Sequence, residues 1–199
     1  MAKQKIKTVL DYFICKFPEK KLNEELKSFT EIKANSFKNS YIDNILLENV
    51  KIIEESAFEN CKELKLAIWR DKNVQVNHLL TTDNLNTYLF EVKDASNKNK
   101  KTKEENKVSN LPTIIIQHSA FKSCEKLETI IFPNNPCVIE KDAFAQCKTL
   151  RTVVLPGGDT EIAGDPFIGC NNLTIVCKKD DYNLQAYARA HSIRIVEID

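Results

Sequence analysis

The stretch Ile139–Pro156 reads IEKDAFAQCKTLRTVVLP, and the same spelling returns before and after it in the chain. Its phenylalanine, Phe144, lies midway between Phe121 and Phe167 in the sequence. Each of the three has an Ile five residues earlier, a Cys three residues later and a Leu six residues later. These residues are Ile116, Ile139, Ile162, Cys124, Cys147, Cys170, Leu127, Leu150 and Leu173. The chain is therefore built of internal repeats.

Two further clear units precede this stretch, centred on Phe58 and Phe37. Their accompanying residues are Ile53, Cys61 and Leu64 for the later unit, and Ile32 with Ser40 in the cysteine position for the earlier one. A sixth, degenerate unit is predicted between Phe58 and Phe121, because the spacing is kept there although the residue types differ. It comprises Leu79, Thr82, Leu85, Tyr88 and Phe90.

A period of about 21 to 23 residues with fixed apolar positions predicts one solenoid coil per repeat, since one unit cannot bury its apolar face alone. The run after each cysteine, such as Leu127 to Phe132, is rich in strand-forming residues and ends at a proline. We expect it to be a short parallel strand, with the first three strands near residues 42–47, 64–69 and 85–90. Each repeat phenylalanine should be buried, which contributes roughly 2 to 3 kcal/mol.

The repeat resembles the BspA-type leucine-rich repeat, whose units run roughly Ile-x-x-x-Ala-Phe-x-x-Cys-x-x-Leu-x-x-Ile-x-Ile-Pro. Ala57-Phe58, Ala120-Phe121 and Ala143-Phe144 match it most closely, and the resemblance covers about residues 32–199. It implies an α/β leucine-rich-repeat arc, to which we assign about six coils with the parallel sheet on the concave face. Members of the family serve varied functions, often at the cell surface.

One structural domain is predicted, with the solenoid over residues 31–178 between two caps. Residues 1–30 contain two runs with helical spacing and should form a helical cap; an amphipathic membrane anchor is the alternative, favoured by Lys3, Lys5, Lys7 and Lys16. Residues 179–199 should form a helix–strand cap, with a helix over 182–190 that Asp180 or Asp181 caps and a strand over 193–198.

The spacing predicts an inserted loop at about residues 92–110, which is rich in lysine and lacks apolar side chains to bury. The simpler interpretation is an exposed, mobile, solvated loop. The alternative is a site for phosphate or an acidic partner. Its candidate residues are Lys98, Lys100, Lys101 and Lys103.

Composition narrows the possible functions. The 199 residues include 29 basic and 28 acidic ones, so the charges nearly cancel. The overall charge of the chain therefore does not favour binding to nucleic acid. No apolar run reaches the roughly 18 residues of a membrane span. The amino terminus is a poor secretory signal, which predicts a cytoplasmic protein, or a secreted or cell-surface one if a leader has been removed.

The seven cysteines predict buried free thiols rather than a metal or disulfide site, because four of them occupy the repeat position and no Cys-x-x-Cys occurs. His118-Ser119 near Cys124 could suggest a nucleophile and a base, but the segment is the repeat turn and its copies lack the histidine. We expect no catalytic residue, metal or cofactor.

The candidate site is the outward surface of the strands. One aliphatic residue recurs there in every unit, and Glu128 and Arg151 lie nearby. The recurring residues are Leu46, Ile68, Leu89, Ile131 and Val154. Such a patch is larger than soluble monomers usually leave bare, so we interpret it as the contact for a protein partner or a second copy. The alternatives are that β-propensity alone selects these residues, or that the inserted loop folds over them. The predicted function is a non-catalytic protein-interaction or adhesion module, with an accessory domain of an enzyme as the rival.

Overall fold

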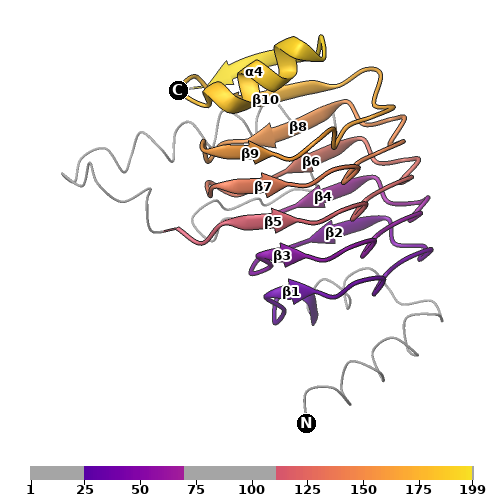
Figure 1. Cartoon of the computed structure of the whole chain (residues 1–199). Helices are drawn as coiled ribbons and strands as arrows, with labels where there is room; N and C mark the ends of the chain where they lie inside the picture. Colours follow the sequence, from indigo (N-terminus) through magenta and orange to yellow (C-terminus); the bar gives the residue numbers. More distant parts are fainter. Residues whose placement is uncertain (1–24, 70–110, 199) are drawn as a thin grey trace.

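The computed structural model describes residues 25–69 and 111–198, which form a parallel β-solenoid of about six turns (Figure 1). Five coils each carry one repeat phenylalanine, and a last turn of helix and strand closes the stack. Two parallel sheets run along the solenoid, because every coil contributes one short strand to each of them.

Sheet B contains the strands predicted from the Leu-x-x-Ile-x-Phe runs. Its spatial order is β11-β10-β8-β6-β4-β2, so neighbouring coils lie side by side. Its strands are β2 (Asn44–Leu46), β4 (Leu66–Ile68), β6 (Thr129–Ile131), β8 (Thr152–Leu155), β10 (Thr174–Lys178) and β11 (Arg194–Ile198). The two predicted early strands at 42–47 and 64–69 are thus confirmed, although each is shorter than expected.

Sheet A was not predicted. Each of its strands ends on the recurring Ile that precedes the repeat phenylalanine, and the order β1-β3-β5-β7-β9 again follows the coils. Its strands are β1 (Glu31–Ile32), β3 (Ile52–Ile53), β5 (Ile114–Ile116), β7 (Cys137–Ile139) and β9 (Thr160–Ile162). Two or three residues are too few for an alternating pattern to be recognised.

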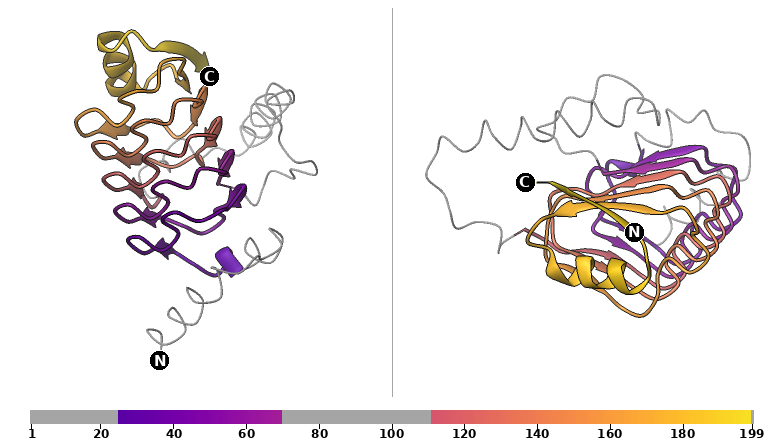
Figure 2. Two further views of the ribbon diagram at one scale, coloured as in Figure 1. Left: turned by 90° about the vertical axis from the view of Figure 1, so that its right-hand side faces the viewer. Right: turned by 90° about the horizontal axis from the view of Figure 1, so that it is seen from above.

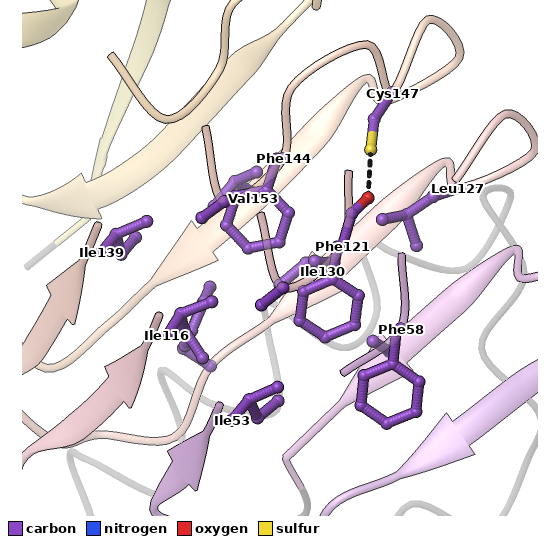
Figure 3. Close-up of a cluster of buried hydrophobic side chains, with 14 of the residues drawn as sticks. Ile53, Phe58, Ile116, Phe121, Leu127, Ile130, Ile139, Phe144, Cys147 and Val153 are labelled. Atoms are coloured by element: carbon purple, nitrogen blue, oxygen red, sulfur yellow. Dashed lines mark hydrogen bonds between the residues drawn. The ribbon is translucent and has the colours of Figure 1, made fainter. Parts of the chain in front are cut away.

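The repeat phenylalanines stack face to face along the core, between the two sheets (Figure 3). Ring centroids of Phe58 and Phe121 lie 5.1 Å apart, and those of Phe121 and Phe144 lie 5.3 Å apart. The turns that carry them are also joined by backbone hydrogen bonds, such as Phe121 N–H to the Ala143 carbonyl at 2.7 Å. The turns that carry the phenylalanines thus form a third side of the solenoid. Ring stacking and backbone hydrogen bonds join these turns from coil to coil, although they are not β-strands.

Small polar residues on each side of the phenylalanine allow this turn. Around Phe37, Phe58, Phe121 and Phe144 the residues two before and two after the phenylalanine adopt a positive φ, as Ser119 does at 56° and Ser123 at 59°. Asn and Asp tolerate this conformation better than other residues with side chains. Asn39 and Asn60 occupy equivalent positions, and the Asn60 side-chain amide donates to Asn39 Oδ1 at 2.6 Å.

The degenerate unit predicted at residues 79–90 lies outside the described residues, and no coil of the described residues stands between those of Phe58 and Phe121. Strand β4 pairs directly with β6, and β3 pairs directly with β5, so the coil of Phe58 is followed in space by the coil of Phe121. The predicted loop at about 92–110 falls within residues 70–110, which link β4 to β5 and which the structure does not describe. The predicted strand at 85–90 lies outside the described residues.

The carboxy-terminal cap is confirmed. Helix α4 (Tyr182–Ala190) begins after Asp181, whose side chain accepts a hydrogen bond from Leu184 N–H at 3.2 Å. It packs on β9 and β11 at the end of the solenoid (Figure 2). The predicted amino-terminal helices fall mainly in residues 1–24, outside the described residues; of the second run, Glu25 and Leu26 are helical.

Candidate partner-binding face

Strand register aligns one aliphatic residue on each of the six strands of sheet B. Ile68 pairs with Ile131, Ile131 with Val154, and further pairs extend the row in both directions. We call this row the aliphatic column: Leu46, Ile68, Ile131, Val154, Val176 and Val196. Four of the five predicted members are present.

The prediction did not include Val176 and Val196. The Thr-Ile-Val run of β10 repeats the Thr-Ile-Ile run of β6, so the signal for Val176 was present in the sequence. Leu89 lies outside the described residues. Among the described residues, Ile68 and Ile131 are direct neighbours in the column.

The aliphatic column lies on the face of sheet B that points away from the core. Along β6, Ile130 is buried inside the solenoid, and side chains alternate between the two faces of a strand. Ile131 therefore points outward. The members of the column accordingly take no part in the cluster of buried residues that forms the main core.

Most of the column is nevertheless buried. Ile131 is 0% exposed and Val154 1%, while Val176 and Ile68 are 3% and 4% exposed. The ends are more open, since Leu46 is half-buried and Val196 is 38% exposed. The centre of the outer face of sheet B is thus a second apolar layer, separated from the main core by the sheet.

Charged residues precede the strands at the entry edge of sheet B. Asp43, Lys65, Glu128 and Arg151 follow one another on adjacent coils, so the sign of charge alternates along the stack. Backbone bonds set this order, with Glu128 N–H donating to the Lys65 carbonyl and Arg151 N–H to the Glu128 carbonyl, both at 2.9 Å. We call these four residues the charged row. Glu128 is half-buried and the other three are exposed.

Lys98, Lys100, Lys101 and Lys103 lie outside the described residues. Of the predicted partner-binding residues in the described ranges, the register brings Leu46, Ile68, Ile131 and Val154 into one line, with Glu128 and Arg151 at the edge beside them.

The cysteines of the repeat position are free thiols, three of them buried and Cys170 half-buried. Each thiol donates to the carbonyl of the phenylalanine one coil earlier, as Cys147 Sγ does to the Phe121 carbonyl at 3.0 Å (Figure 3). Burial raises the pKa of Cys170 to about 12. These thiols are consequently structural groups that fill a small slot and satisfy a backbone carbonyl.

The residues that could suggest a nucleophile and a base are not arranged around a site. Ser119 Oγ lies 3.2 Å from His118 Nε2, and His118 Nδ1 lies 2.9 Å from the Lys141 carbonyl. The Cys124 thiol points elsewhere, to the Phe58 carbonyl at 3.2 Å. Ser119 is itself buried at a positive φ in the repeat turn.

Metal-binding clusters and membrane-spanning helices are both absent from residues 25–69 and 111–198. Within these ranges, no cluster of three or more His, Cys, Asp or Glu side chains is arranged to hold a metal ion. No helix there has the length and hydropathy to cross a bilayer.

The fold places this chain in the class of parallel β-solenoids that have one leucine-rich-type repeat per coil. The family model described as BspA type leucine rich repeat region (6 copies) matches residues 12–98 and 95–198. The chain belongs to this family. No curated protein and no solved structure gives a significant match to it.

Proposed function

We propose that this chain is a non-catalytic protein-interaction or adhesion module whose partner contacts the outer face of sheet B. The observation that carries the proposal is the aliphatic column, because six aliphatic residues stand in register on a sheet face that the main core does not use. Family membership supports the general role, since stacked repeats offer a long regular surface for binding.

The charged row supplies the second element of such an interface. Protein interfaces combine an apolar centre with a polar rim, and charges at the rim steer the encounter and select the partner. Lys65 and Arg151 are exposed at the edge of the sheet that carries the column. The partner should therefore bury aliphatic groups and present opposite charges to this row.

The test compares two double charge reversals in a partner-binding assay, after isolation of a partner with the purified chain as bait. Lys65→Glu/Arg151→Glu alters the charged row, and Lys51→Glu/Lys148→Glu makes the same charge change at exposed positions outside it. We expect the first variant to bind at least about tenfold more weakly and the second to bind like the parent, because only the first removes rim charges. Equal binding by both variants would exclude this face.

A second copy of the chain is one partner that the same face could take. Light scattering coupled to size-exclusion chromatography distinguishes this case. A dimer of the parent that becomes a folded monomer in Leu46→Lys/Val196→Lys, at the two more open members of the column, would identify the column as a self-association surface. A monomeric parent would exclude self-association through this face.

A further inference from the structure

We propose that β11 binds an extended segment of another protein, which adds to sheet B as one more strand. β11 is the last strand in the spatial order of sheet B, at the carboxy-terminal end of the stack (Figure 1). Among the described residues, β10 is the one strand that pairs with it. We call the side of β11 that faces away from β10 the open edge. With five residues, β11 is long enough to hold a peptide by main-chain hydrogen bonds.

The hydrogen bonds of β11 show which of its backbone groups line the open edge. Lys179 N–H donates to the Ile198 carbonyl at 3.2 Å, so the backbone groups of Ile198 face β10. Successive residues of a strand direct these groups to opposite sides, so Val196 also faces β10, whereas Ile195 and Glu197 face away from it. Neither of the latter has a backbone hydrogen bond to another described residue. Their N–H and C=O groups thus provide two donors and two acceptors at the open edge.

The other edges of the two sheets differ from the edge at β11. In β2, at the opposite edge of sheet B, Asn44 and Leu46 both have interaction partners. In sheet A, the last strand β9 is covered by helix α4 (Figure 2), and the first strand β1 is only two residues long. The carboxy-terminal cap therefore closes sheet A and leaves the edge of sheet B open.

The side chains of β11 indicate which sequence the added strand should carry. Arg194 and Val196 point to the outer face of sheet B, Glu197 points to the other face, and all three are exposed. A parallel strand would continue the pairing of sheet B and place one residue opposite each of them. Cross-strand pairing then favours an acidic residue opposite Arg194, an aliphatic one opposite Val196 and a basic one opposite Glu197. The aliphatic residue would lengthen the aliphatic column by one strand.

The inference deepens the proposed function and rests on it for the biological role, because it names an extended peptide as the partner and β11 as the place where it binds. The two proposals nevertheless fail separately. Charge reversal at Lys65 and Arg151 tests the charged row, and neither residue belongs to β11. The variant Lys65→Glu/Arg151→Glu should therefore bind a peptide at the open edge as the parent does.

The first experiment titrates the isotope-labelled full-length chain with a synthetic peptide that contains Glu-Ile-Val-Lys-Ile, the β11 sequence with its two charges exchanged. In NMR spectra, we expect the largest amide shifts at Ile195 and Glu197. In the free chain, these two amides should exchange with solvent at least about tenfold faster than those of Val196 and Ile198, which face β10. Slow exchange at Ile195 and Glu197 would show that the edge is already filled and would overturn the proposal.

Backbone methylation of the peptide distinguishes strand addition from contact through side chains alone. In the parallel arrangement, the N–H groups of the peptide's valine and final isoleucine donate to β11. N-methylation of both should abolish binding. N-methylation of the first isoleucine and the lysine, whose N–H groups point away from β11, is the matched control and should leave binding nearly unchanged. Equal binding by the two methylated peptides would contradict strand addition, and so would a failure of the unmodified peptide to bind.

A charge exchange in the chain tests the side-chain pairing. The variant Arg194→Glu/Glu197→Arg should prefer a peptide with Arg-Ile-Val-Glu-Ile over the first peptide by roughly three- to tenfold, and the parent should show the opposite preference. Both residues are exposed, so the variant should keep the fold, which its amide spectrum reports. The same preference in the parent and the folded variant would contradict the parallel register.

Discussion

Ile68 and Ile131 are neighbours in sheet B, although the whole of segment 70–110 lies between them in the sequence. Other neighbouring coils are 21 to 23 residues apart, as the pairs Asn39–Asn60 and His118–Lys141 show. The solenoid therefore continues across segment 70–110 as if it were absent, and both the ladder of sheet B and the phenylalanine stack are uninterrupted. This continuity aligns the aliphatic column.

The phenylalanine stack should dominate stability. Phe144 contacts a ring on each side, with centroids 5.3 Å from both Phe121 and Phe167, so Phe144→Ala should lower the free energy of unfolding by about 3 to 5 kcal/mol. Phe37, at the amino-terminal end of the described stack, is slightly exposed, and Phe37→Ala should cost about half as much. Urea denaturation of both variants tests this difference. Equal losses would show that stacking on a second ring adds nothing.

Two adjacent glycines should respond differently to alanine. At Gly157 a Cβ atom would overlap the Asn135 backbone of the coil below, so Gly157→Ala should cost about 3 kcal/mol or more. At Gly158 there is room, but its φ of +68° disfavours a side chain, so Gly158→Ala should cost about 1 kcal/mol. Thermal unfolding compares the two. A milder effect at Gly157 than at Gly158 would contradict the close approach of these coils.

Asp181 should tie the cap to the solenoid. Its Oδ1 accepts from Leu184 N–H and its Oδ2 from Thr160 N–H, both at 3.2 Å, and the residue is buried. Asp181→Ala removes the helix cap and leaves a buried N–H unsatisfied, which should cost about 2 to 4 kcal/mol. Asp181→Asn retains one acceptor and should lose about half of that. Equal effects in urea denaturation would argue against the second bond.

Stability should fall in alkali because the thiols of Cys137, Cys170 and Cys177 resist ionisation in the folded state. Burial raises the pKa of Cys137 and Cys170 to about 12 and that of Cys177 to about 11. An unfolded thiol ionises near pH 8.5, so the unfolded state loses protons first. The contribution is complete below that pH and is lost as the pH rises towards 11 or 12. The urea midpoint should therefore decrease from pH 8 to pH 10.5, and a constant midpoint would contradict the assignment.

Much of the fold follows from the repeat alone. Fixed spacing predicted the strands of sheet B, the buried phenylalanines and the helix that ends at Ala190, because each depends on an apolar pattern or a cap within one unit. Sheet A was missed because its two- or three-residue strands have no period. The only sequence signal for sheet A is the Ile that lies five residues before each phenylalanine. The residues around it become a strand because they form hydrogen bonds with the neighbouring coils.

The degenerate unit shows where spacing misleads. Residues 79–90 keep the phase of the repeat, but Leu79 stands where a phenylalanine should be, and Thr82 where a cysteine should be. A coil in that place would interrupt the stack of Phe58 on Phe121 with an aliphatic side chain. The spacing of apolar residues indicates that they can be buried. It does not indicate which other residues they pack against, because that depends on contacts between segments far apart in the sequence.

The alignment of the aliphatic column follows in part from the alternation of side chains within each strand. Alternation within each strand placed Ile131 and Val154 on the outer face, and register then set them in line. Their burial could not be inferred from the alternation within one strand.

Zero-length carbodiimide crosslinking tests the direct stacking of the two parts of the solenoid most directly. Lys126 Nζ lies 2.6 Å from Glu63 Oε2, and Lys62 Nζ lies 3.2 Å from Glu125 Oε1, across the point where the chain omits segment 70–110. We predict that mass spectrometry of the monomer will recover one or both crosslinks, together with the control crosslink Lys33–Glu54 between two earlier coils. An intervening coil would separate the first two pairs by about 10 Å. Recovery of the Lys33–Glu54 crosslink without either of the other two would contradict the direct stacking of the coil of Phe58 on the coil of Phe121.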